Sequence, residues 1–146
     1  MKAINNNFQG YIFSRSINGS SIPQKVQGII IRNYCIKNNL NYLFGSIEYS
    51  IEDSYIILNN LINSIDKYRG LVFYSFFQLP EEKNVREIMY KKILQYNKEV
   101  HFVMEDLVIK KSNYKDTIKQ IESCIIINTI MAENSDFNYI KKINTL

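Results

Sequence analysis

Short apolar segments alternate with amphipathic segments along most of the chain. Four apolar segments rich in aromatic and β-branched residues predict strands, and a short extended piece over residues 107–109 either continues the fourth or stands alone. Between the strands, apolar residues recur at the three- and four-residue spacing of an amphipathic helix. The predicted strands cover residues 10–14, 40–47, 71–77 and 100–104, and the predicted helices cover residues 21–38, 50–69, 79–97 and 113–123.

Two segments carry residues that typically begin helices. Ser21 and Gln24 have the spacing of a capping box, with Pro23 in the first turn. Residues 50–53 place two acids where they complement the helix dipole. The apolar stripes predict the inner faces: Val26, Ile29, Ile30 and Asn33 in the first helix, Ile51, Tyr55, Leu58, Ile62 and Ile65 in the second, and Val85, Ile88, Met89 and Ile93 in the third.

The segment over residues 124–130 fits two structures. Its β-branched residues favour a strand, but Ile121 and Ile125 continue the stripe of the preceding helix, so we predict a continuing helix. Residues 131–146 form a polar tail. The length of 146 residues is that of one domain, since typical domains hold about 100–150 residues. We therefore expect a single α/β domain, 1–146, with its core over about residues 10–130.

The order of the predicted elements determines the fold class. Strands that alternate with helices imply right-handed crossovers and a mostly parallel sheet of four or five strands, with helices on both faces. We therefore predict a small three-layer, flavodoxin-like α/β domain.

Composition removes several classes of protein. No apolar run approaches the roughly 18 residues that span a bilayer, and the first residues do not form a signal peptide, so we expect a cytoplasmic protein without a membrane partner. Cys35 and Cys124 are expected to be reduced thiols. With His101 as the single histidine, expected to be structural, we predict no metal site. The net charge of +4 comes from dispersed lysines, which argues against nucleic-acid binding.

Candidate chemistry follows from the strand ends, because ligands of open parallel sheets bind beyond the carboxyl ends of the strands. The sequence lacks both the Walker loop and the G-x-G-x-x-G fingerprint, and we expect no cofactor, although the loop after the first strand also fits FMN. The candidate residues are Ser14, Arg15, Ser16 and Asn18 after the first strand, Gln24 in the first helix, Glu48 and Tyr49 after the second strand, Tyr74 and Ser75 after the third, and Glu105 after the fourth.

Arg15 is the central candidate. It is one of four arginines and stands between a strand and a helix start, where it suits a phosphate or carboxylate, with Ser14 and Ser16 as further donors. The alternative is a surface arginine paired with an acid. Glu48 either orients Arg15 or acts as a general base, or else is a structural ion pair or helix-capping acid.

The remaining candidates would form the wall and the rim of the site. Tyr49 and Tyr74 either contact the ligand or are core tyrosines with a hydrated hydroxyl. Gln24, Ser75 and Glu105 are expected on the rim, and Ser75 would be a nucleophile only if a base lay beside it.

Several of these segments together resemble the sporadic carbohydrate cluster family of small bacterial proteins, over roughly residues 10–125. The resemblance implies a role in synthesis of surface polysaccharide such as O-antigen or capsule, and it implies no particular reaction. With the strand-end residues, it predicts an enzyme or binder of a phosphorylated or nucleotide-activated sugar. The matching segments are residues 11–15 (YIFSR), 23–27 (PQKVQ), 31–35 (IRNYC), 48–49 (EY) and 74–80 (YSFFQLP).

Two further functions stay open. The first is a non-catalytic interaction or regulatory module. Separately, we expect that the chain can form a homo-oligomer through a helix face. The second rests on a weaker likeness to the catalytic domain of serine recombinases. Residues 11–16 hold serine and arginine in a different spacing from that family, and residues 77–80 (FQLP) replace its arginine-rich segment, so we expect no DNA cleavage.

Overall fold

The computed structural model describes residues 5–145, except for the side chains at positions 137 and 139. It forms two compact units, Met1–Asn113 and Tyr114–Leu146. The first unit holds the sheet and the second is a single helix, α4 (Tyr114–Asn144). Among the described residues, no helix is both long and apolar enough to cross a membrane.

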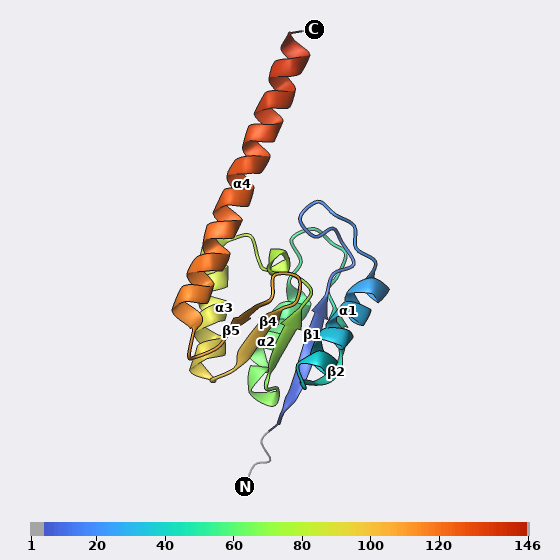
Figure 1. Ribbon diagram of the computed structural model, residues 1–146, viewed down its shortest axis with the longest axis vertical. Coiled ribbons are helices and arrows are strands. Elements are labelled where there is room, and N and C mark those ends of the chain that lie inside the picture. The colour runs from blue at the N-terminus through green and yellow to red at the C-terminus, as the bar shows by residue number, and fades with distance from the viewer. Residues whose placement is uncertain (1–4, 146) are drawn as a thin grey trace. The chain divides into compact units, whose positions relative to one another are not determined.

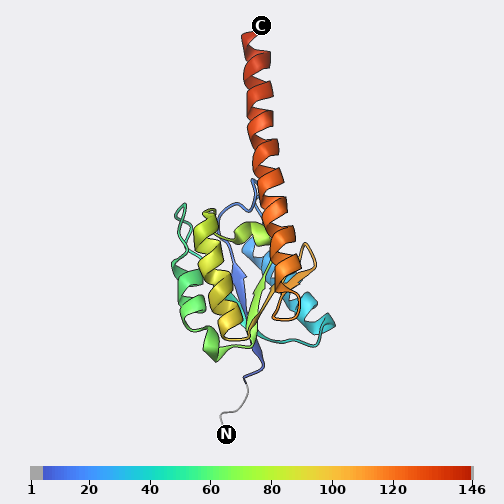
Figure 2. The same cartoon turned by 90° about the vertical axis from the view of Figure 1, so that its left-hand side faces the viewer.

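The first unit is the predicted α/β fold (Figure 1). Its five-stranded sheet has the order β2-β1-β3-β4-β5, in which the first four strands are parallel and β5 runs antiparallel to β4. Figure 2 shows α2 and α3 on one face of the sheet and α1 on the other. The elements are β1 (Asn7–Ile12), α1 (Gln24–Lys37), β2 (Asn41–Ile47), α2 (Ile56–Asn63), η1 (Ile65–Lys67), β3 (Gly70–Phe73), η2 (Phe76–Gln78), α3 (Lys83–Gln95), β4 (Glu99–Phe102) and β5 (Leu107–Ile109).

A row of aromatic side chains forms the core on one face of the sheet. Tyr11, Phe73 and Phe102 come from three adjacent strands, and their neighbouring ring centroids lie 5.0 and 5.3 Å apart. All three are fully buried. Because side chains alternate along a strand and Ile12 reaches Gly28 of α1, this aromatic row faces α2 and α3.

The predicted inner face of α1 is wrong. Gln27, Ile31 and Cys35 are buried, at the four-residue spacing of a helix, whereas Val26 and Ile29 are exposed. Apolar residues occupy more than one face of this helix, so periodicity alone selected the wrong stripe. The predicted capping box is also absent: the helix begins at Gln24, Pro23 takes the N-cap position, and no side chain caps it.

The predicted start of α2 is also wrong. The helix begins at Ile56, and Ile51 is 69% exposed. Asp53 has a φ of 59°, a left-handed conformation that interrupts a right-handed helix. The acids of this segment therefore lie in a turn before the helix.

The third strand and the third helix are shorter than predicted. β3 ends at Phe73, because Ser75 and Gln78 form a capping box that opens η2. α3 begins at Lys83; Met89 and Ile93 are buried as predicted, whereas Val85 and Ile88 are exposed. Buried Arg86 takes part of the inner face, because its Nη1 donates to the carbonyl oxygens of Pro80 and Glu81.

The two ambiguous segments have definite structures. Residues 107–109 form a separate strand, β5, that pairs with β4 through a hairpin. Residues 124–130 are helical, as predicted, and the predicted tail over residues 131–146 continues the same helix to Asn144.

Candidate functional site

The strand order reverses between β1 and β3, which is where an open parallel sheet leaves a crevice at its carboxyl edge. Two fully buried glutamines occupy this part of the fold. Gln27 Oε1 accepts from the Phe13 N–H, at 3.0 Å, and its Nε2 donates to the carbonyl oxygens of Phe13 and Ile22. Gln78 Oε1 accepts from the Ser75 N–H, at 3.0 Å. Interior side-chain amides thus pair with backbone groups of the loop after β1 and of the segment after β3.

Sequence reasoning missed Gln27, whereas Gln78 stands among the polar residues after the third predicted strand, where site residues are expected. Gln27 had a usable signal, because it stands one helical turn before Ile31 on what proves to be the inner face of α1. Gln78 had a second signal, since Ser75 and Gln78 have the spacing of a capping box.

Arg15 is held in one orientation by the loop that follows β2. Its Nη1 donates to the carbonyl oxygens of Tyr49, at 2.9 Å, and Ile51, at 3.3 Å. Its Cζ atom lies 4.2 Å from the ring centroid of Phe13 and 5.0 Å from that of Tyr55. Nη2 is buried and has no hydrogen-bond partner. The guanidinium is therefore positioned by its neighbours and keeps one unsatisfied donor group.

The Glu48 carboxylate is saturated with donors. Oε2 accepts from the Tyr11 hydroxyl, at 2.9 Å, and from the Leu58 N–H, at 3.1 Å. Oε1 accepts from three more donors, the backbone N–H groups of Tyr49 and Ile57 and the Ser54 hydroxyl. Burial acts to raise the pKa of Glu48, but the hydrogen bonds from Leu58, Tyr49 and Ile57 outweigh it and lower the pKa below its ordinary value. This is the geometry of an acid that caps the N-terminus of α2.

Ser75 and Glu105 form a second cluster at the ends of β3 and β4. The Ser75 hydroxyl donates to Glu105 Oε1 over 2.5 Å, and the Phe76 N–H donates to Oε2 over 3.3 Å. Burial raises the pKa of Glu105 above its ordinary value, against the opposing effect of hydrogen bonds from Ser75, Phe76 and its own backbone N–H. A carboxylate does lie beside Ser75, and this contact joins two of the predicted rim residues that are 30 positions apart in the chain.

Six candidate residues remain to be placed: Ser14, Ser16, Asn18, Gln24, Tyr49 and Tyr74. The Ser14 hydroxyl donates to the Glu48 carbonyl oxygen, which joins the ends of β1 and β2. Tyr49 is exposed and Tyr74 is buried. The structure thus gathers Ser14, Arg15, Glu48 and Tyr49 at one place and Ser75 and Glu105 at another, whereas Ser16, Asn18 and Gln24 are exposed along the loop and helix start between β1 and α1.

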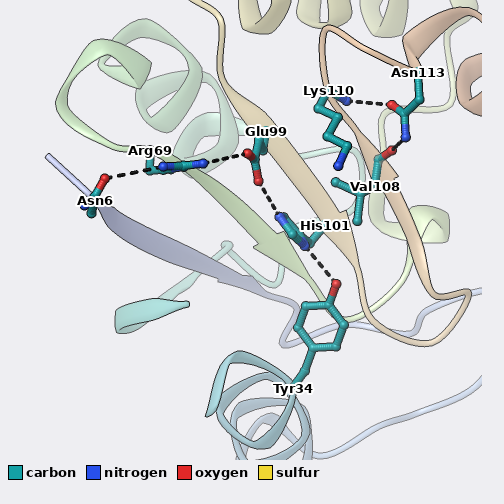
Figure 3. Close-up of polar contacts among 8 residues, drawn as sticks. All are labelled: Asn6, Tyr34, Arg69, Glu99, His101, Val108, Lys110 and Asn113. Carbon is teal, nitrogen blue, oxygen red and sulfur yellow. Dashed lines mark hydrogen bonds and ion pairs between the residues drawn. The ribbon is translucent and has the colours of Figure 1, made fainter. Parts of the chain in front are cut away.

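A third polar cluster surrounds His101, in the middle of β4 (Figure 3). Its Nδ1 lies 2.8 Å from the Tyr34 hydroxyl on α1, and its Nε2 lies 3.0 Å from Glu99 Oε2. The other Glu99 oxygen is paired with Arg69 at 3.1 Å, and Arg69 also reaches Asn6. Burial lowers the pKa of His101 and raises the pKa of Tyr34 to about 12. The network therefore favours a neutral imidazole and a neutral phenol.

Within the described part of the chain, no group of three or more histidine, cysteine, aspartate or glutamate side chains is arranged to hold a metal ion. The chain matches no model of a known protein family. A comparison with curated proteins also finds no match.

Proposed function

We propose that this chain binds a phosphorylated or nucleotide-activated sugar during synthesis of bacterial surface polysaccharide. The ligand would bind at the carboxyl ends of β1 and β2, in the cytoplasm. The resemblance of residues 10–125 to the sporadic carbohydrate cluster family supports the role in polysaccharide synthesis. The surroundings of Arg15 support the location of the binding site.

The observation that carries this proposal is the state of the Arg15 guanidinium. Two carbonyl oxygens and two aromatic rings hold it, and its buried Nη2 has no partner. Leaving a buried donor unpaired costs about 1–3 kcal/mol, and more for a charged group. A phosphate oxygen that displaced the groups covering Nη2 would remove that cost, since guanidinium N–H groups form strong, charge-assisted hydrogen bonds with phosphate. Ser14 and Ser16 would add hydroxyl donors from the same loop.

We further propose that any proton transfer at this edge uses Glu105 rather than Glu48. Two carboxylates whose surroundings move their pKa values in opposite directions take different roles. Glu48 is held as an anion by five donors, whereas Glu105 has a raised pKa and fewer donors. Ser75 would position Glu105 through their hydrogen bond.

A non-catalytic interaction module is the second candidate function. The observation in its favour is the outer edge of the sheet, where Leu43, Phe44 and Ile47 of β2 are exposed apolar side chains. Apolar side chains on an edge strand are typical of surfaces that pair with another chain.

We also propose that the chain forms a homo-oligomer through α4. This 31-residue helix carries four exposed apolar side chains within two turns: Ile126, Ile127, Ile130 and Met131. Burial of such a stripe against the same helix of a second copy removes apolar surface from water.

A thermal-shift and calorimetric titration tests the sugar-binding proposal. UDP-glucose, glucose 1-phosphate and FMN would be titrated against the full chain, with glucose as the uncharged probe. We expect the phosphorylated sugars to raise the melting temperature and glucose to have no effect. Arg15→Gln should abolish that shift, whereas Arg32→Gln, at an exposed position on α1, should leave it unchanged. Undiminished binding by a folded Arg15→Gln variant would overturn the proposal, and a shift with FMN alone would redirect it to a flavin.

A further inference from the structure

An apolar groove lies between α2 and α3, on the face of the sheet opposite α1. The two helices run side by side in Figure 2 and contact one another directly. The groove has a volume of about 300 Å³, at the lower end of the roughly 300–1,000 Å³ typical of small-molecule sites. Its apolar lining consists of Leu58, Ile62, Pro80, Val85, Ile88 and Met89.

The floor of the groove is buried and its rim is exposed. Leu58 and Met89 are almost fully buried, whereas Ile88 is 68% exposed and Val85 is also exposed. Val85 and Ile88 are also the two residues of the third helix for which burial was wrongly predicted from the apolar stripe. Water covers this apolar rim, so a ligand that buries it is favoured because apolar surface is removed from water.

One charged residue lines the groove among those that the structure describes. The Lys92 ammonium donates to Asn63 Oδ1 over 2.8 Å, in a hydrogen bond that is exposed to solvent. This amide oxygen is neutral, so it satisfies a hydrogen bond without neutralising the charge. No aspartate or glutamate is among the lining residues. The electrostatic complement of the groove is therefore an anion at the Lys92 end.

We propose that this groove binds a small amphipathic molecule, with an apolar chain against Leu58, Ile88 and Met89 and an anionic head hydrogen-bonded to Lys92. The volume argues against a partner helix, since a helix with its side chains is about 10–12 Å across and needs a wider channel. A narrow alkyl chain fits both the lining and the single cation. This site is independent of Arg15 and of the proposed sugar site.

The test uses four ten-carbon probes on the full chain: decyl phosphate, decanoate, decanol and decyltrimethylammonium. Isothermal titration would give affinities, and methyl NMR would report on Ile88 and Met89. We expect both anions to bind more tightly than decanol and the ammonium probe to bind least. The phosphate and carboxylate arms distinguish the two kinds of head group.

Three variants locate the binding. Lys92→Gln should weaken decyl phosphate binding about tenfold and leave decanol binding unchanged. Ile88→Asp, at an exposed position that tolerates polarity, should abolish binding of every anionic probe. Lys91→Gln removes a neighbouring charge that does not line the groove and should have no effect. The proposal fails if decyl phosphate does not bind, if the ammonium probe binds as well as the anions, or if Ile88→Asp binds normally.

Discussion

The Tyr34 hydroxyl and His101 Nδ1, 67 positions apart, join α1 to the middle of β4 across 2.8 Å. The other ring nitrogen faces the Glu99 carboxylate, which can only accept, so Nε2 carries a proton and Nδ1 of the neutral ring accepts from Tyr34. A second proton on the imidazole would remove this acceptor. Nδ1–H would then donate to the Tyr34 oxygen, so protonation would reverse this hydrogen bond and place a charge on a buried ring.

The burial of the His101 ring predicts a loss of stability in mild acid. Burial lowers the pKa of folded His101 below its ordinary value of 6.5, although Glu99 acts in the opposite direction. The unfolded chain then binds more protons, so the stabilisation is complete above pH 6.5 and is lost as the pH falls from there through the folded pKa. Urea unfolding at several pH values between 7.5 and 5 would measure it. His101→Gln should flatten this slope, and an unchanged slope would contradict the assignment.

Glu48 should be essential for stability and not only for binding. Glu48→Gln removes the negative charge that five donors share at the start of α2. We expect a loss of about 2–3 kcal/mol in the free energy of unfolding at pH 7, because charge-assisted hydrogen bonds and a helix cap are lost together. Since the folded pKa is lowered, this stabilisation should disappear as the pH falls below about 4.5. Exposed Glu52→Gln is the matched control and should change stability little.

The contribution of Glu105 to stability should change with pH in the opposite direction to that of Glu48. Its raised pKa means that the folded protein keeps this proton to a higher pH, so its contribution to stability is lost as the pH rises through that pKa. At pH 7, Glu105→Gln should thus be neutral or stabilise the fold by up to about 1 kcal/mol, as is common for residues kept for function. Carboxyl NMR titration should also show a higher pKa for Glu105 than for Glu48. Ser75→Ala should raise the Glu105 pKa further, and a fall on this substitution would refute the role of Ser75.

The oligomer predicted for α4 has a direct test. Ile127→Glu combined with Ile130→Glu places two charges in the exposed apolar stripe and should shift the molar mass in light scattering to that of one chain. Because both side chains are exposed, helicity by circular dichroism should be retained. Asn134→Glu, at an exposed polar position, should keep the larger species. A single-chain mass for the unmodified protein would disprove the oligomer.

The fold was predictable because strands that are buried on both faces of a parallel sheet appear as continuous apolar runs in the sequence. The run LVFYSFF marked β3, and the strand–helix order gave the arrangement that the structure shows. Helix faces were less predictable where apolar residues exceed what the core accommodates. Val26, Ile29 and Ile88 are exposed, while Gln27 and Arg86 take inner positions because nearby backbone groups require their hydrogen bonds.

Parts of the site were hidden from the sequence for a different reason. The edge that holds Arg15 follows from strand order, but its partners are carbonyl oxygens of Tyr49 and Ile51, which no side-chain pattern reveals. The pairs Ser75–Glu105 and Tyr34–His101 join distant segments, and only their three-dimensional arrangement brings them together.

The two buried glutamines, Gln27 and Gln78, hold the backbones of their loops from inside the protein. The conformation of these loops therefore does not depend on the side chains at their surface. Because the loop backbones are tied to interior amides, an exposed position such as Ser16 can change with little loss of stability, commonly within about 0.5 kcal/mol. A scaffold of this kind is evolvable. New ligand specificities can arise at its carboxyl edge by substitution of surface residues, while the inherited backbone stays the same.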